Sequence, residues 1–572
     1  MSTEPKLSKV EHAKRDSRGL RGGLAEAVAG GATRFVGEDP TLLKFHGIYE
    51  QYDRDAREKV ENRTYNYMVR LAIPGGVLTA DQYLAIDRLA EEHGGGTLRL
   101  TTRQGIQFHG LLLGELKPTL QALHRSLLTT LAACGDVRRN VMACPAPLTD
   151  PAHRTVQRVA AEIARELEPK SRAYAEIWLD GERLELSAEP EEPFYGTTYL
   201  PRKYKVGVAL AGDNCIDLHA YDAGLVGLLG ADGDVAEWNI LSGGGLGITH
   251  GKSDTFARLA SPIGSVPVAW GVAAIRAVAA LYRDHGNRED RKHARLKYIV
   301  ESWGVERFRQ ALAAELGHPV APPRPVPPSN QEDHLGVHDQ GDGRVFLGVF
   351  IENGRVIGPL RSGLAEVVRR FQPGVRLTAM QSLLLTDLDR SDLPAIQALL
   401  ADHGIATVER LSTTRRWSMA CPALPTCSLA LTDAERALPA AISDLEAEFA
   451  RLAIDDVPLT VRMTGCPNGC ARPYNADLAF VGKKPGAYHV YVGGGLSGDR
   501  LADLFAVEVP ADSFVDTLRP LLERYRDERH PGEALGDFWQ RLAGHAPRTL
   551  LTGKEEALGE RVLGLQLVEV AP

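Results

Sequence analysis

Four of the seven cysteines of this 572-residue chain gather in one short stretch, residues 421–470. They follow the pattern C-x5-C, a gap of 38 residues, and then C-x3-C inside the segment TGCPNGC, which places them at Cys421, Cys427, Cys466 and Cys470. Four thiolates that converge from two loops are a suitable ligand set for a metal centre. Gly465 and Gly469 would let the backbone approach closely, and Pro467 would stiffen the turn.

The spacing of these cysteines favours an iron–sulfur cluster and leaves two alternatives open. Structural zinc sites use tighter C-x2-C or C-x4-C spacings, whereas a cubane cluster tolerates irregular spacing because its iron corners are widely separated. Zinc is the first alternative, and four core cysteines that bind no metal are the second.

Two segments of the sequence recur at a single offset of 277 residues, which indicates an internal duplication. GTLRLTTRQ at 96–104 recurs as GVRLTAMQ at 374–381, and RRNVMACPAP at 138–147 recurs as RRWSMACPAL at 415–424. Two unrelated matches at one offset are hard to obtain by chance. The chain is therefore predicted to be a duplicated unit of roughly 250 residues.

The two copies differ in the residues that could do chemistry. If residues 99–109 form one strand, one face carries Arg99, Arg103, Gln107 and His109, although a bulge at Gly105 would shift the phase. The counterparts of the last three in the second copy are Met380, Leu384 and Thr386. Cys144 matches Cys421, but Asp150 stands where the second copy has Cys427. The first copy thus keeps a cationic face, which could also be a solvated strand, and the second keeps the cysteines.

Two further groups of cations stand in the first copy. Lys203 and Lys205 in YLPRKYK would share one face of a strand, and holding them together makes sense if an oxyanion lies between them. In GNREDRKHARLKY, at 286–298, Arg288, Arg291 and Arg295 would fall near one helical face. A solvated strand edge and a solvated helix are the alternatives.

Composition limits the function classes. The net charge of −8 gives no sign of a nucleic-acid binder, so any anionic ligand requires a local basic cluster. The sequence holds no apolar run long enough to span a bilayer, and its start lacks the apolar segment of a secretory signal, so we expect a cytoplasmic protein that does not insert in membranes.

The pattern predicts an α+β fold in which each half holds a small βαβ-type segment and a larger mixed α/β domain, and the two small segments pair about a pseudo-twofold axis into one compound domain. Thr79 and Gln82 form a capping box that opens a helix after the strand-like run YNYMVRLAI. The expected segments are an extended arm at 1–60, half-domains at 61–135 and 335–412, a first α/β domain at 136–316, a proline-rich linker at 317–334, and a second α/β domain at 413–572.

The motifs HGIYEQYDRD, RLTTRQGIQFHG, RRNV, YLPRKYK, SMACPALPTC and TGCPNGC, in this order, closely resemble the sulfite reductase hemoprotein family, relatives of ferredoxin-dependent nitrite reductases. The resemblance covers about residues 17–540. It implies a siroheme bridged to a [4Fe–4S] cluster through a shared cysteine, and a six-electron reduction of sulfite to sulfide. The resemblance also implies that the two small segments are ferredoxin-like half-domains.

Carried over residue by residue, the resemblance implies three groups of site residues. The cluster ligands would be Cys421, Cys427, Cys466 and Cys470, with Cys470 as the bridge to the siroheme iron. The substrate-facing cations would be Arg70, Arg139, Lys203 and Lys205. The residues that hold siroheme, which carries eight carboxylates, would be Arg99, Arg103, Gln107, His109, Arg202, Arg288, Arg291, Lys297, Asn468 and Cys470.

The substrate choice turns on Lys203-Tyr204-Lys205. Sulfite enzymes of the family tend to have Lys-x-Lys here, and a dianion gains more from the second cation than nitrite does, so we expect an assimilatory sulfite reductase. The alternatives are an assimilatory nitrite reductase and, from another class, a non-catalytic metal-binding structural protein. No dinucleotide fingerprint follows a predicted strand, so electrons must come from a separate protein, either a ferredoxin or an NADPH-dependent flavoprotein.

Overall fold

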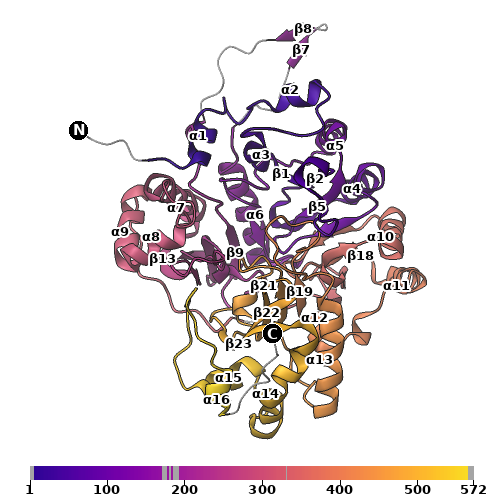
Figure 1. Cartoon of the computed structure of the whole chain (residues 1–572), viewed down its shortest axis with the longest axis vertical. Coiled ribbons are helices and arrows are strands. Elements are labelled where there is room, and N and C mark those ends of the chain that lie inside the picture. Colours follow the sequence, from indigo (N-terminus) through magenta and orange to yellow (C-terminus); the bar gives the residue numbers. More distant parts are fainter. Residues whose placement is uncertain (1–5, 171–176, 180–181, 185–191, 330, 565–572) are drawn as a thin grey trace.

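The computed structural model describes residues 6–170, 177–179, 182–184, 192–329 and 331–564. The first five residues of the predicted arm, residue 330 of the linker, and residues 565–572 of the predicted second α/β domain lie outside the described residues. The fold is α+β, as predicted, and it contains the duplicated ferredoxin-like units (Figure 1).

Two five-stranded sheets form the compound domain, and each sheet borrows one edge strand from the other half of the chain. The first has the order β1-β2-β5-β4-β16, with bounds Ile48–Gln51, Asn66–Arg70, Ile106–Leu111, Leu98–Leu100 and Arg355–Val356. The second has the order β14-β15-β18-β17-β3, with bounds Gly336–Asp339, Val345–Val349, Leu383–Leu388, Gly374–Leu377 and Val77–Leu78. Arg355 pairs with Arg99, and Arg376 pairs with Val77. The exchange relates the halves by the pseudo-twofold axis that the repeat predicted.

Gln104 and Gln381, which match at the offset of 277, reinforce this exchange. Both adopt left-handed backbone conformations, with φ of 51° and 62°. The buried Gln104 amide donates to the Leu377 carbonyl at 3.0 Å, and the Gln381 amide donates to the Leu100 carbonyl at 3.5 Å. Each glutamine therefore ties the turn of its own half to a strand of the other.

Helices cover the sheets of the compound domain, and side chains from both halves share one apolar core. The predicted helix α4 is present, and the Thr79–Gln82 capping box closes its start. Helices α4 and α10 pack against each other across the pseudo-twofold axis. The helices are α4 (Ala80–His93), α5 (Leu113–Arg125), α10 (Gly358–Phe371) and α11 (Leu393–Asp402).

The two α/β units have sheets of the same topology. Their strand orders are β6-β9-β10-β11-β13 and β19-β20-β21-β22-β23; in each sheet the first two pairings are parallel and the last two are antiparallel. The first set spans Met142–Ala143, Val206–Leu210, Ala223–Leu229, Val235–Ser242 and Ser261–Pro267, and the second Ser418–Ala420, Val461–Thr464, Leu478–Lys484, Ala487–Val492 and Asp503–Pro510. β6 therefore corresponds to β19, and β9 to β20.

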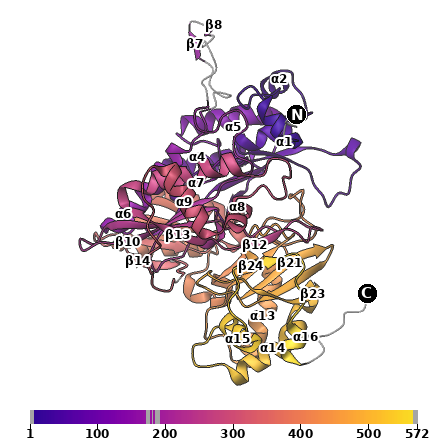
Figure 2. The ribbon, with the colours of Figure 1, turned by 90° about the vertical axis from the view of Figure 1, so that its left-hand side faces the viewer.

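Helices pack on both of these sheets. Those of the first unit are α6 (Pro151–Glu166), α7 (Gly271–His285), α8 (Leu296–Trp303) and α9 (Val305–Leu316). Those of the second are α12 (Thr413–Arg416), α13 (Leu438–Leu452), α14 (Phe514–Glu528), α15 (Leu535–Ala543) and α16 (Gly559–Leu563). The second unit lies below the rest of the molecule in both views (Figures 1 and 2). Strand β24 (Leu550–Thr552) returns to pair with β12 (Phe256–Arg258), and β7 (Ile177–Leu179) pairs with β8 (Glu182–Leu184).

Three local predictions were wrong. Residues 99–109 are a hairpin, because the chain turns at 101–105, where Thr101 accepts from Gln104 and donates to Gly105. Residues 286–295 form a loop, and helix α8 begins only at Leu296. Lys203 and Lys205 precede strand β9 and do not alternate within it.

The N-terminal arm is packed against the domains along much of its length. It carries the short helices α1 (Lys9–Arg15), α2 (Leu24–Ala29) and α3 (Asp39–Leu42), and its last part supplies the edge strand β1. Leu20, Leu42 and Phe45 are buried in the core of the first α/β unit. These apolar residues are widely spaced in the sequence, so no local period revealed them.

Candidate active site at the junction of the two halves

Two parallel strands position the four clustered cysteines. Cys421 directly follows β19, and Cys466 stands two residues beyond β20, which pairs with it. The backbone N–H of Gly465 donates to Cys421 Sγ at 3.4 Å, and the Asn468 amide donates to Cys466 Sγ at 3.4 Å. A Cβ at Gly465 would lie 2.5 Å from the Thr432 carbonyl oxygen, so the approach of these loops requires glycine.

The four thiols perturb one another. Burial and then the charge of Cys470 raise the pKa of Cys421 well above its usual range, and the same two causes raise the pKa of Cys466 to about 12. The same order of causes raises the pKa of Cys427. Thiolates so close together need a bound cation to stay deprotonated.

The spacing of the sulfur atoms separates a cluster from a single zinc ion. The sulfurs of a tetrahedral zinc site lie about 3.8 Å apart, given Zn–S bonds of about 2.3 Å. Among the described residues, no three of these four sulfur atoms lie within 4.8 Å of one another. These positions are therefore wider than one zinc ion requires, whereas a [4Fe–4S] cluster takes its ligands at wider spacing.

A cationic cluster faces Cys470, the exposed member of the four. Arg70 at the end of β2 and Arg139 both contact Cys134: Arg70 Nη1 lies 2.7 Å and Arg139 Nη2 lies 3.3 Å from its Sγ. Burial lowers the pKa of Arg139, but the negative charges of Cys134, Tyr49, Asp136 and Cys470 together raise it. Arg70 and Arg139, which the family resemblance assigned to the substrate, therefore lie close together.

Lys203 and Lys205 complete this cluster. Burial, followed by the charges of Arg295 and Arg202, lowers the pKa of Lys203 to about 7. Burial and then Lys203 hold the pKa of Lys205 well below its usual value, while Cys470 acts in the opposite direction on both. Within the described part of the chain, neither Nζ has a hydrogen-bond or ion-pair partner, which is the condition of a site built for an anion.

Arg103, Gln107 and His109 lie on the hairpin beside these cations. Arg103 Nη2 donates to the Asn140 carbonyl at 2.6 Å and its guanidinium lies over the Tyr221 ring at 4.4 Å, whereas its buried Nε and Nη1 have no hydrogen-bond partner among the described residues. The Gln107 amide lies between Arg70 and His109: its oxygen accepts from Arg70 Nε at 2.8 Å, and its nitrogen then lies 3.4 Å from His109 Nε2. The unpartnered guanidinium atoms of Arg103 fit the carboxylates of a polyanionic cofactor.

Several residues predicted to hold the cofactor have partners within the protein. Arg99 is ion-paired with Glu435, and Lys297 donates to the carbonyls of Gly245, Gly247 and Phe256. Arg288 pairs with Glu11 at 2.5 Å. These side chains hold the walls of the site together, and the sequence could not reveal this because most of the partners are far apart along the chain.

Asp136 gathers a second group of these cations. It accepts two hydrogen bonds from Arg291, at 2.7 and 2.9 Å, and lies 3.8 Å from Arg202. Lys14 of the arm lies 3.6 Å from the same carboxylate. The arm therefore contributes to the electrostatics of the site.

Four residues that join the halves around the site were not identified from the sequence. The buried Asp217 is ion-paired with Arg462 at 2.9 Å and with Arg472. Arg472 also donates to the Thr102 carbonyl at 2.7 Å. Arg54 of the arm donates to the Cys427 carbonyl at 3.0 Å. Arg472 stands two residues after Cys470, so that position in TGCPNGCARP was the one available signal.

Comparison with known families decides the assignment. The domain described as "Nitrite and sulphite reductase 4Fe-4S domain" matches residues 159–320 and 412–546, and the "Nitrite/Sulfite reductase ferredoxin-like half domain" matches residues 59–126 and 338–403. The chain belongs to the nitrite and sulfite reductase family. The cofactors of this family are siroheme and a [4Fe–4S] cluster.

Relatives of known name support the same family. The chain is 44% identical to the sulfite reductase [ferredoxin] of Synechococcus elongatus, over 95% of this chain and 90% of that protein. It is 42% identical to the sulfite reductase [NADPH] hemoprotein beta-component of Myxococcus xanthus, over 96% of this chain and 98% of that protein.

A solved structure shares the fold. The Mycobacterium tuberculosis NirA protein superposes with a TM-score of 0.79 at 24% identity, over 94% of this chain and 96% of that chain. Within the described residues, no helix combines the length and the apolar character needed to cross a bilayer.

Proposed function

We propose that this protein is an assimilatory sulfite reductase, which reduces sulfite to sulfide with six electrons from a separate donor protein. The observation that carries the proposal is the group of four cations, Arg70, Arg139, Lys203 and Lys205, beside Cys470. Two of these carry ammonium groups without a partner among the described residues. Their mutual repulsion is relieved when a polyanion binds between them.

The cluster ligands under this proposal are Cys421, Cys427, Cys466 and Cys470, with Cys470 as the bridge to the siroheme iron. Arg103 would bind siroheme carboxylates through Nε and Nη1, while Gln107, His109 and Asn468 position neighbouring groups. When bound, the siroheme and the cluster supply the redox chemistry. The side chains supply charge, orientation and protons.

The four cations have two roles in this reaction. Arg70 and Arg139 bind and orient the sulfite oxygens, because a planar guanidinium pairs well with an oxyanion. Lys203, with its pKa lowered to about 7, is about half protonated at neutral pH, so its Nζ can both take up a proton and give it up as an oxygen leaves as water. Lys205 adds positive charge where the substrate is most negative.

Sulfite is preferred over nitrite because the substrate site holds a second lysine and because the relatives named above are sulfite reductases. The test is to measure kcat/KM for both anions with one electron donor, alongside the visible spectrum. We expect siroheme absorption bands and a higher kcat/KM for sulfite. A colourless zinc protein, or a higher kcat/KM for nitrite, would refute the proposal.

The donor is a separate protein, since the relatives include both a ferredoxin-named and an NADPH-named enzyme. Turnover should be assayed with reduced ferredoxin and, separately, with NADPH plus a flavoprotein. Turnover with either protein supports a protein donor. Turnover with a chemical reductant but with neither protein contradicts it.

A further inference from the structure

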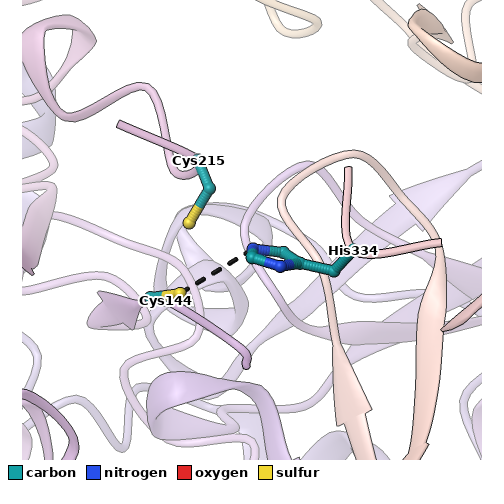
Figure 3. Close-up of side chains that lie close together, drawn as sticks. All are labelled: Cys144, Cys215 and His334. Atoms are coloured by element: carbon teal, nitrogen blue, oxygen red, sulfur yellow. Dashed lines mark hydrogen bonds between the residues drawn. The ribbon is translucent and has the colours of Figure 1, made fainter. Parts of the chain in front are cut away.

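Cys144, Cys215 and His334 take no part in the proposed reaction, yet their side chains point toward one another inside the first half of the molecule (Figure 3). The two sulfur atoms and one imidazole nitrogen all lie within 4.8 Å of one another, and all three residues are buried. Cys144 Sγ lies 3.7 Å from His334 Nε2. Among the described residues, no other group of three or more potential ligands is this tight.

The pseudo-twofold relation of the α/β units gives this group its place in the fold. Cys144 directly follows β6 as Cys421 directly follows β19. Cys215 lies in the loop after β9, and Cys466 lies in the loop after the corresponding β20. Both pairs of thiols therefore occupy the ends of two adjacent parallel strands. The first half thus has its own thiol pair where the second half has its metal ligands.

The geometry suits a single small ion and not a cluster. In a tetrahedral zinc site, Zn–S bonds of about 2.3 Å and Zn–N bonds of about 2.0 Å place sulfur and nitrogen about 3.6 Å apart. The distance from Cys144 Sγ to His334 Nε2 is close to this value. Asp213 lies beside the group, with its Oδ2 3.4 Å from Cys215 Sγ, but its carboxylate is not among the ligand atoms that lie within 4.8 Å of one another.

We propose that Cys144, Cys215 and His334, brought together at the end of the first α/β sheet, bind one Zn²⁺ ion. Two thiolates balance the charge of the ion in this buried setting, and a neutral imidazole adds none. Asp213, next to the site, also lines a groove together with the connector segment 323–326. This inference does not depend on the substrate of the enzyme.

The ion would have a structural role. His334 stands at the end of the proline-rich connector, where its backbone is left-handed with φ of 57°. A bond from zinc to its imidazole fixes the connector to the first α/β unit just before strand β14 begins. Zinc therefore stabilises the junction through which the second half of the chain is joined to the first.

Metal analysis of the holoenzyme tests the site directly. Protein purified from zinc-supplemented cells should contain about one zinc per chain in addition to its iron. X-ray absorption at the zinc edge, to which iron and siroheme do not contribute, should show two sulfur ligands at about 2.3 Å and nitrogen or oxygen at about 2.0 Å. A zinc content below about a tenth of one per chain, even after incubation of the reduced protein with Zn²⁺, would overturn the proposal, as would a Cys144–Cys215 disulfide in the purified protein.

Variants separate this site from the proposed cluster site. Cys144→Ser, Cys215→Ser and His334→Ala should each lose most of the zinc but keep the siroheme spectrum. The matched control His338→Ala alters a nearby histidine whose Nε2 bonds to the Leu335 carbonyl, and it should keep the zinc. Cys427→Ser should lose the cluster and keep the zinc. Zinc retained in Cys144→Ser, or lost in Cys427→Ser or His338→Ala, would show that the ion is bound elsewhere.

Discussion

Replacing Lys205 by asparagine removes one positive charge from the proposed substrate site and keeps a side chain that can donate a hydrogen bond. Sulfite as a dianion should lose more transition-state stabilisation than nitrite, which carries one charge. Lys205 is half-buried and its Nζ has no partner among the described residues, so no ion pair within that part of the protein is broken by the change. The effect should therefore fall on the anion.

The size of the effect follows from Coulomb's law and from the neighbours of Lys205. One charge about 5 Å from another, at an effective dielectric constant near 20, contributes roughly 3 kcal/mol per substrate charge. Lys203 lies close enough to depress the pKa of Lys205, and this repulsion disappears in the variant, which offsets part of the loss. We expect kcat/KM for sulfite relative to nitrite to fall by about ten-fold or more, which corresponds to at least about 1.4 kcal/mol.

The assay measures kcat/KM for sulfite and nitrite on wild type and Lys205→Asn with the same electron donor. The exposed Lys292 provides the matched control, and Lys292→Asn should leave the ratio unchanged. An unchanged ratio in Lys205→Asn, in protein with a wild-type visible spectrum, would refute a role for this lysine in substrate choice. The preference for sulfite would then rest on resemblance alone.

Three other variants test the site. Cys470→Ser should abolish the magnetic coupling between siroheme and cluster in electron paramagnetic resonance spectra, since a hydroxyl is a poor bridging ligand. The control variant Cys134→Ala should keep its iron. Normal coupling in Cys470→Ser would show that another residue is the bridge. Arg103→Met should bind siroheme with about ten-fold lower affinity, because charged hydrogen bonds contribute about 1.5–3 kcal/mol. The purified variant should then show a lower ratio of visible to protein absorbance, and a ratio equal to that of wild type would contradict the role of Arg103. Asp136→Asn should lower Tm at pH 7. Burial alone would raise the pKa of Asp136, but the charges of Arg291 and Lys14 outweigh burial and lower this pKa from 3.8 to about 2. The ion pairs of Asp136 therefore stabilise the folded protein above pH 3.8, and this stabilisation is lost as the pH falls toward 2. The difference in Tm from wild type should shrink over that range, and a constant difference would exclude this ion-pair network as the cause.

Repetition and local pattern were sufficient to predict the α+β fold and its pseudo-twofold pairing. The capping box at Thr79 correctly marked the start of α4, because capping depends on residues three positions apart. The offset of 277 between Arg99 and Arg376 anticipated the symmetry but not the exchange of β3 and β16. Which edge a two-residue strand joins is decided by tertiary packing, and no local period encodes it.

The candidate site was predictable to the extent that its residues lie in short motifs. The cysteines and the Lys203–Lys205 pair converge, and both groups were marked by type and spacing. The sequence could not distinguish cationic side chains that are available to a ligand from those that are bonded to other protein groups around the site. Arg99 and Lys297 look like ligand-binding residues, but Glu435 and three carbonyls satisfy them. Such partners are found only once the chain is folded.

The exchange of β3 and β16 has a consequence for the order of events during synthesis. When the first half leaves the ribosome, its sheet still lacks the edge strand at Arg355–Val356, and β4 has an open edge. The second sheet in turn must find Val77–Leu78, which was made nearly three hundred residues earlier. The proposed cluster ligands come later still, up to Cys470. The proposed cluster site can therefore be completed only after Cys470 has been made, and until β16 arrives the open edge of β4 is able to pair with another nascent chain.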